Sequence, residues 1–273
     1  MAGDLHCHTK LSDGSSDTID LISYAARIGL DAVAMTNHDT IDGVNDAVNL
    51  GKAYGVRVIP GVEISAIDSV RGTKVHLLCY NYRREDEIRQ LCGDILKSRR
   101  EAGEIMIERA MKMYPLTYEH VMHYARESCS IYKQHIMRAL MDLGYSQSIF
   151  GPVFKRLFSS KSSENILEPV KYSDIRDVIR VVKRSGGKAV IAHPAYYGNF
   201  ELIDELIRLK VLDGIEVMHP RNPDSAQKQL LETAVKHGLI VTGGSDFHGM
   251  NSSTPVFLGM CTTGGEMIKR LME

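Results

Sequence analysis

Residues 31–39, with the sequence DAVAMTNHD, are the most informative stretch for the fold class. The first six residues are mostly apolar and predict a buried strand. His38 and Asp39 follow where that strand is expected to end. Polar side chains at the ends of buried strands are typical of the site in an α/β protein.

A helix is expected on each side of this strand. The first would begin at Asp17 or Thr18 and end at Gly29, since glycine is common just past a helix. The second covers residues 44–54, and a further strand follows over residues 56–62. This order predicts a strand–helix–strand unit.

The same alternation occupies the rest of the chain outside its middle third. Further strands are expected at residues 74–80, 188–192, 214–218 and 239–242. Further helices are expected at residues 174–184, 200–209 and 225–236. The repetition favours a parallel sheet, either doubly wound or closed into a barrel.

Residues 85–169 differ, because they hold helical patterns and few strand candidates. Helices are predicted over residues 85–113, 117–126 and 132–143, and residues 159–164 (SSKSSE) are expected to form a loop. We therefore predict a barrel or sheet domain from residues 1–84 and 170–273. Residues 85–169 would form a helical insertion.

Composition excludes several classes of protein. The chain has 273 residues, 44% hydrophobic and 25% charged, which is typical of a folded globular protein. A net charge of -1 argues against a general nucleic-acid binder. Five cysteines without a C-x-x-C pair, no apparent signal peptide and no membrane-length apolar run favour a cytoplasmic protein with no membrane partner.

Histidines and carboxylates gather at the expected strand ends. His6 and His8 form an H-x-H pair whose side chains would share one face of a strand, and Asp246 and His248 repeat that spacing. The other candidates are Asp13, His38, Glu63, His76 and His193. Imidazole and carboxylate are the ligands that divalent transition metals take, so these segments predict a metal site.

Taken one at a time, these residues also have ordinary structural interpretations. His38 and His76 could be packing residues, the H-x-H pair could be solvated, and Asp13 before Gly14 could belong to a turn. Their shared position at strand ends favours the metal site. The remaining helical histidines are interpreted as surface or structural residues: His120, His123 and His237.

With these motifs in this order, the chain resembles the polymerase-and-histidinol-phosphatase (PHP) family. The resemblance implies a distorted (β/α)₇ TIM-like barrel with the helical insertion. It also implies three divalent cations, with Mn, Fe and Zn all compatible with the ligands. The first would be held by His6, His8, Glu63 and Asp246, the second by Glu63, His76 and His193, and the third by Asp13, His38 and His248.

The implied activity is phosphoester hydrolysis, in which a hydroxide bridging the metals attacks phosphorus. The insertion resembles that of a branch acting on nucleotides, which often carries an Arg-Pro-His stretch where this chain has Lys133, Gln134 and His135. Lys133, His135 and His219 are therefore expected to bind the substrate. That substrate would be a nucleoside 3′,5′-bisphosphate or the 5′ end of a short RNA. The alternative is that Lys133 and His135 are only exposed at a helix start and that His219 only lines the mouth of the barrel.

Two other functions are compatible with these motifs. A histidinol-phosphate phosphatase would share the barrel and the metals but is expected to have a differently built insertion. A non-catalytic metal-binding or nucleic-acid-binding module would be expected to lack one or more ligands. All nine expected ligands are present in this chain.

Overall fold

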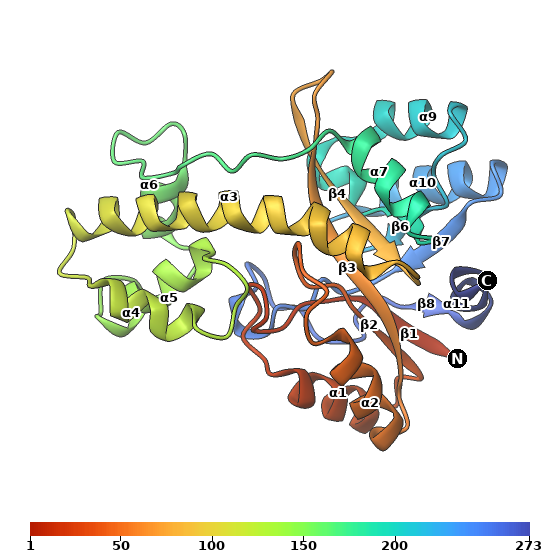
Figure 1. Cartoon of the computed structure of the whole chain (residues 1–273), viewed down its shortest axis with the longest axis horizontal. Coiled ribbons are helices and arrows are strands. Elements are labelled where there is room, and N and C mark those ends of the chain that lie inside the picture. Colours follow the sequence, from red (N-terminus) through yellow and green to blue (C-terminus); the bar gives the residue numbers. More distant parts are fainter.

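The computed structural model describes residues 1–273 and has two lobes, a barrel and a helical lobe (Figure 1). One sheet of eight strands forms the barrel, in the order β7-β6-β5-β4-β3-β2-β1-β8. The strands are β1 (Ala2–Cys7), β2 (Ala32–Met35), β3 (Arg57–Asp68), β4 (Thr73–Tyr80), β5 (Lys188–Ile191), β6 (Gly214–Met218), β7 (Ile240–Gly243) and β8 (Thr263–Gly264). This confirms the expected α/β barrel.

The two ends of the sheet meet beside β1. The His8 amide donates a hydrogen bond to the Phe247 carbonyl (2.8 Å), and the Phe247 amide donates to the His6 carbonyl (3.2 Å). A Cβ added to Gly244 would lie 2.3 Å from Cβ of His6, so only glycine permits this approach. Closure therefore brings the segment after β7 against the end of β1.

The sheet departs from the expected parallel arrangement at β4 and at β8, a strand that was not expected. β4 pairs antiparallel with both β3 and β5, and β8 pairs antiparallel with β1. Only four residues, Ser69 to Gly72, join β3 to β4. A parallel connection needs a crossover of a dozen or more residues, so this short link imposes a hairpin.

Helices cover the outside of the barrel. They are α1 (Thr18–Arg27), α2 (Val44–Tyr54), α7 (Ile175–Arg184), α9 (Phe200–Arg208), α10 (Asp224–Lys236) and α11 (Gly265–Met272). The short helix α8 (Pro194–Tyr197) follows β5 and lies against β4, with the Tyr197 ring 5.2 Å from the His76 ring. The larger buried cluster packs helix residues such as Leu21 and Val178 against strand residues such as Val33 and Ile191. A smaller cluster joins Leu5, Ile59 and Val190 to Ile268 and Leu271 of α11.

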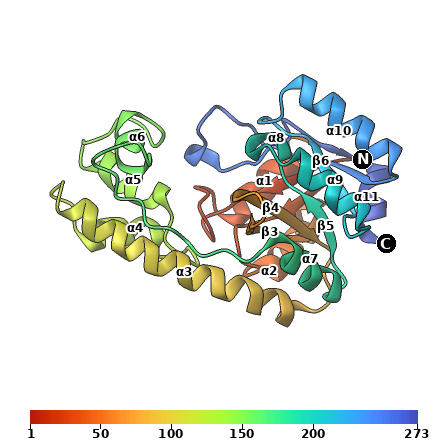
Figure 2. The same ribbon diagram turned by 90° about the horizontal axis from the view of Figure 1, so that it is seen from above.

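The helical lobe consists of α3 (Glu85–Met111), α4 (Tyr118–Ala125), α5 (Lys133–Asp142) and α6 (Pro152–Phe158). A separate cluster of 16 buried residues, all from residues 106–166, forms its core. The long helix α3 joins the two lobes: Ile88 and Ile95 pack in the barrel cluster, whereas Met106 and Ile107 pack in the lobe (Figure 2).

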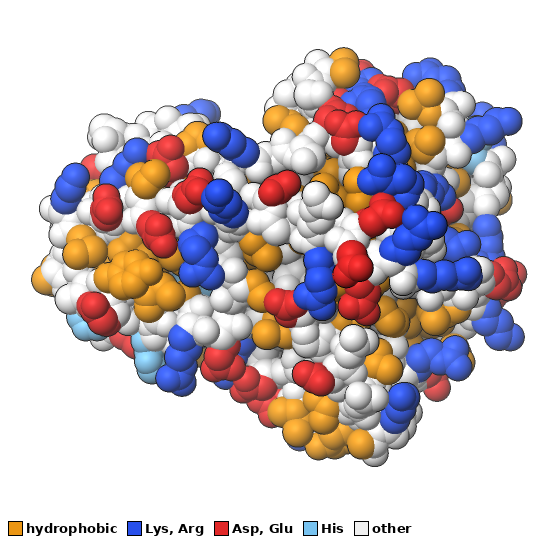
Figure 3. Space-filling model, in the orientation of Figure 1, with side chains coloured by type: hydrophobic (Ala, Val, Ile, Leu, Met, Phe, Trp, Pro, Cys, Tyr) orange, Lys and Arg blue, Asp and Glu red, His pale blue; other side chains and the backbone are white.

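The surface of the molecule carries mixed charges. On the face shown in Figure 3, acidic and basic side chains are interspersed over the helical lobe. No helix of the chain is both long enough and apolar enough to cross a membrane.

Candidate metal centre

The nine predicted ligands come together at one end of the barrel. Glu63 lies at their centre and is 1% exposed. Its Oε1 lies 2.7 Å from His76 Nδ1 and 2.9 Å from His193 Nε2. Its Oε2 lies 3.0 Å from His6 Nε2, 3.1 Å from His8 Nε2 and 3.3 Å from His38 Nδ1. One carboxylate therefore faces five imidazoles.

The hairpin explains part of this arrangement. Glu63 pairs with Leu78 across β3 and β4, and His76 is two residues before Leu78. Diagonal neighbours of this kind lie on one face of an antiparallel pair, within reach of long side chains. The antiparallel β4 thus places an imidazole beside the Glu63 carboxylate.

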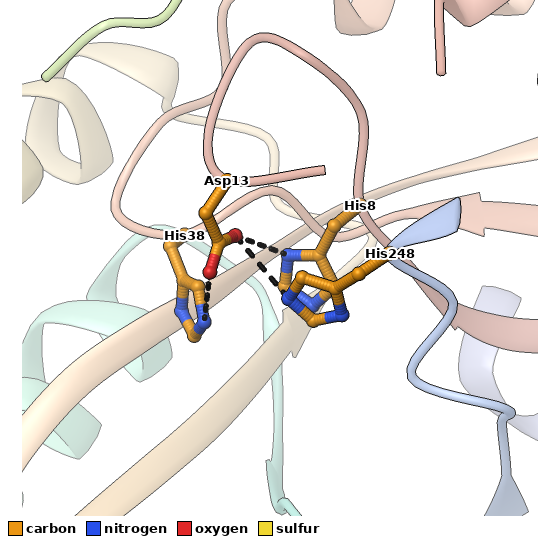
Figure 4. A group of neighbouring side chains, drawn as sticks. All are labelled: His8, Asp13, His38 and His248. Carbon is orange, nitrogen blue, oxygen red and sulfur yellow. Dashed lines mark ion pairs between the residues drawn. The ribbon is translucent and has the colours of Figure 1, made fainter. Parts of the chain in front are cut away.

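A second carboxylate, Asp13, lies in the loop after β1 and is 4% exposed (Figure 4). Its Oδ1 lies 3.2 Å from His248 Nε2 and 3.8 Å from His8 Nδ1. Its Oδ2 lies 4.0 Å from His38 Nε2. These four residues could hold one cation together.

The third carboxylate, Asp246, follows β7. Its Oδ1 lies 3.3 Å from His8 Nε2, 3.5 Å from His6 Nε2 and 3.3 Å from His248 Nδ1. Together with Glu63, His6, His8 and Asp246 form a second group able to hold a cation. His8 faces both groups, one through each ring nitrogen.

The donor atoms of this centre fit divalent cations. Six of them are buried and make no hydrogen bond of good geometry: His6 Nε2, both ring nitrogens of His8, Asp13 Oδ1, His38 Nδ1 and Glu63 Oε2. A buried polar atom without a partner costs about 1–3 kcal/mol. Nitrogen and carboxylate oxygen atoms that face a common space would be satisfied by a transition-metal ion.

The carboxylates are held in the ionised state that such an ion requires. Burial by itself would raise the pKa of Glu63, but the surrounding imidazoles, His38 and His6 above all, hold that pKa well below its usual range. Burial would also raise the pKa of Asp13. The imidazoles of His248 and His38 outweigh that effect and hold the pKa of Asp13 well below its usual range.

Sequence reasoning missed two buried carboxylates that support the ligands. Glu216 of β6 lies with Oε1 2.9 Å from His6 Nδ1, and its Oε2 accepts the amide proton of His193 (2.8 Å). Asp4 accepts hydrogen bonds from the amide (2.9 Å) and hydroxyl groups of Ser245, beside Asp246. A carboxylate inside a buried strand needs a partner, and that signal could have identified Glu216.

These hydrogen bonds lie beside two candidate ligands that have a left-handed backbone conformation. His193 has φ 27° and Asp246 has φ 55°, a region that costs non-glycine residues about 1–3 kcal/mol. The hydrogen bond from His193 to Glu216, and those from Ser245 to Asp4, hold the backbone in this conformation.

The three expected substrate residues occupy different surroundings. His219 is fully buried, with Nε2 3.5 Å from Asp246 Oδ2. Its Nδ1 accepts the Arg221 amide proton (3.0 Å), so the ring proton of a neutral His219 lies on Nε2. Lys133 is half-buried, and burial together with Lys74 and Arg99 lowers its pKa to about 8.

His135 is buried at the start of α5. Its Nδ1 accepts the amide proton of Tyr132 (3.2 Å), and burial lowers its pKa to about 4. It is therefore neutral near pH 7 and forms part of a helix cap. The other helical histidines, His120, His123 and His237, are exposed, as expected.

A polar hollow opens beside the centre. Its walls include His219, Asp246 and His248 of the barrel and Gln134 and Phe150 of the helical lobe.

Comparisons with known proteins agree with this geometry. A family model described as PHP domain matches residues 4–191. A phosphoribosyl 1,2-cyclic phosphate 1,2-diphosphodiesterase from Eggerthella lenta is 35% identical, over 93% of this chain and 97% of that protein. A 3′,5′-nucleoside bisphosphate phosphatase from Chromobacterium violaceum is 27% identical, over 90% and 86%.

A solved structure from Bifidobacterium adolescentis also matches, under the name metal-dependent phosphoesterase. It is 30% identical in sequence with a TM-score of 0.91, and the match covers 99% of this chain and 95% of that one. The likeness therefore includes both the barrel and the helical lobe.

Proposed function

The chain belongs to the PHP domain family, and we propose that its nine clustered side chains hold three divalent cations for hydrolysis of a phosphoester on a small ribose phosphate. The general activity follows from the relatives: the chain is a phosphoester hydrolase. The observation that carries the proposal is Glu63, whose two oxygens lie within 3.3 Å of five imidazole nitrogens.

The division of ligands follows from which atoms face each other. His6, His8, Glu63 and Asp246 would hold the first cation. Glu63 would also contribute to the second with His76 and His193, which face its other oxygen. Asp13, His38 and His248 would hold the third, and the second ring nitrogen of His8 faces this group.

When bound, the cations would acidify a coordinated water and neutralise phosphate oxygens. The chain supplies orientation and hydrogen bonds around them. His219 would donate from Nε2 to a phosphate oxygen, because its Nδ1 already accepts from Arg221. Lys133 precedes Gln134 of the hollow's wall in sequence and would add positive charge on this side of the lobe, although it does not itself line the hollow. His135 would set the start of the helix that carries Lys133.

The helical lobe, residues 85–169, would cap the substrate. Gln134 and Phe150 of this lobe share the walls of the hollow with Asp246 and His248. A nucleoside 3′,5′-bisphosphate would place a phosphate on the cations and the remainder of the molecule against the lobe. The 5′ end of a short RNA would present the same chemistry.

A second candidate substrate is a phosphoribosyl 1,2-cyclic phosphate. It is favoured by the 35% identity to the Eggerthella lenta enzyme over nearly the full length of both chains. The polar hollow also suits a phosphorylated sugar, because its walls have few apolar side chains. In this case both ester bonds to one phosphorus would be the targets.

A comparison of kcat/KM among four substrates tests the proposal. Purified protein with Mn²⁺ would be assayed on adenosine 3′,5′-bisphosphate, 5′-phosphorylated short RNA, phosphoribosyl 1,2-cyclic phosphate and histidinol phosphate. We expect one of the ribose phosphates to have the highest kcat/KM. A higher value for histidinol phosphate, or turnover of none of the four, would overturn the proposed substrate class.

A further inference from the structure

The helical lobe is hydrogen-bonded to the loop that carries Asp13. The Ser128 hydroxyl donates to the Ser12 carbonyl (2.7 Å), and the Cys129 amide donates to the Leu11 carbonyl (3.0 Å). Both contacts join segments more than a hundred residues apart in the chain. They fix residues 128–129 of the lobe against residues 11–12 of the barrel.

A third contact reaches the Asp13 side chain itself. Gln134 Nε2 of α5 donates to Asp13 Oδ2 at 2.8 Å. Hydrogen bonds to an ionised carboxylate are stronger than neutral ones, and this carboxylate is buried. The two Asp13 oxygens therefore have different partners. Oδ2 accepts the hydrogen bond from Gln134 and faces His38, while Oδ1 faces His248 and His8.

The same helix start also touches His38. The Tyr132 hydroxyl donates to the His38 carbonyl at 3.1 Å, and Tyr132 is buried. His135 holds the turn in place by accepting the Tyr132 amide proton. Two residues of the Asp13 group therefore contact side chains from the lobe, Asp13 through Gln134 and His38 through Tyr132.

We propose that Gln134 is a positioning residue for the cation at Asp13, His38 and His248, so that barrel and helical lobe build this position together. The inference rests on the proposed function, because it takes these three residues as ligands. Removing the Gln134 amide would free the Asp13 carboxylate to rotate. Partners that orient metal ligands typically contribute about 10–100-fold in metal affinity.

The test is Mn²⁺ binding by calorimetry on the full chain. For Gln134→Leu, which keeps the side-chain volume, we expect one class of sites to weaken about tenfold or more, with the other sites unchanged. The melting temperature of the metal-free protein should fall only slightly, because one hydrogen bond to a buried carboxylate is lost, and the unchanged affinity of the other sites separates positioning from general loss of stability. Gln134→Ala provides a second variant should leucine disturb the packing.

Two controls make the result specific. Ser128→Ala removes a contact between lobe and loop without touching Asp13, and Gln147→Ala removes an exposed amide of the same lobe. Both should bind Mn²⁺ as wild type does. Wild-type affinities in Gln134→Leu and Gln134→Ala, or equal weakening in Ser128→Ala, would overturn the inference. Absence of Mn²⁺ binding by wild type would instead refute the proposed function.

Discussion

At the scale of single residues, Glu63 is the buried group that most needs compensating partners. It is almost fully buried, yet it accepts contacts from imidazoles on four other strands or strand ends. Such a carboxylate is tolerated only when it is paired or bound to a cation. Its two oxygens face different histidines, which is the geometry of a bridging ligand.

Replacing Glu63 by glutamine should remove activity while keeping the shape of the side chain. We expect kcat/KM to fall by about 10³-fold or more, because the amide cannot bridge two cations. His237→Ala, at an exposed position away from the centre, should stay within about twofold of wild type. Near-normal turnover by Glu63→Gln would contradict the role given to this residue.

Lys133 should make substrate binding depend on pH. Its pKa is lowered to about 8, chiefly by burial, so its charge is present below pH 8 and is lost as the pH rises through that value. KM should therefore rise about tenfold between pH 7 and pH 9 in wild type. In Lys133→Arg the charge persists and this rise should disappear. Identical pH profiles would show that Lys133 does not bind the phosphate.

The sequence identified the residues that cluster at this centre better than the residues that surround them. His6, His8 and Asp246 carry a local signal, since their spacing and position at strand ends can be seen within a few residues. Glu216 carries only the weaker signal of a carboxylate inside an apolar strand, and its partner His6 lies 210 positions away in the sequence. Gln134 meets Asp13 across 121 positions, and only the docking of the lobe brings them together.

At the scale of elements, helices that end at a glycine were predicted closely. α2, for example, spans Val44–Tyr54, as expected, and Gly55 follows with φ 72°. The direction of β4 was not predicted, because a hydrophobic run is the same in either orientation and only the short link to β3 decides it. The last strand and helix, β8 and α11, were also missed, and β8 has only two residues.

The packing of α3 against the barrel should be stabilised by one buried ion pair. Arg99 Nη2 of α3 lies 2.6 Å from Asp39 Oδ2, and Asp39 is fully buried. Arg99→Leu would leave that carboxylate unpaired, and we expect unfolding in urea to show a loss of about 3 kcal/mol or more.

The matched control for this prediction is Arg89→Leu on the same helix. Arg89 pairs with Asp42, and both side chains are about half exposed, 47% and 52%. The expected loss of stability is below about 1 kcal/mol. Equal losses in the two variants would mean that burial of the Arg99 pair makes no difference.

At the scale of the whole molecule, the metal centre lies where the barrel closes and where the helical lobe docks. Residues from both ends of the chain and from the insertion therefore meet at one place. The barrel and the lobe have separate buried clusters, joined along α3. We expect the stability of the whole chain, both lobes included, to rise when cations occupy this centre.

Removing metal should lower the melting temperature of the entire chain. Saturating Mn²⁺ at about 100 times its Kd would add roughly 2.7 kcal/mol of stability for each site that it fills, because it binds only the folded protein. For a chain of this size that corresponds to about 5–10 °C per filled site. Calorimetry after treatment with EDTA, and again after Mn²⁺ is restored, measures the change. A melting temperature that does not respond to either step would contradict the account of the centre.

The central claim is that these clustered side chains make the chain a metal-dependent phosphoesterase. The most direct test is the release of phosphate from adenosine 3′,5′-bisphosphate and from phosphoribosyl 1,2-cyclic phosphate, measured after EDTA treatment and again after Mn²⁺ is restored, for wild type and Asp246→Ala. We predict no release after EDTA, recovery with Mn²⁺ in wild type, and no recovery in Asp246→Ala. Release that persists in EDTA, or full recovery in Asp246→Ala, would contradict the claim.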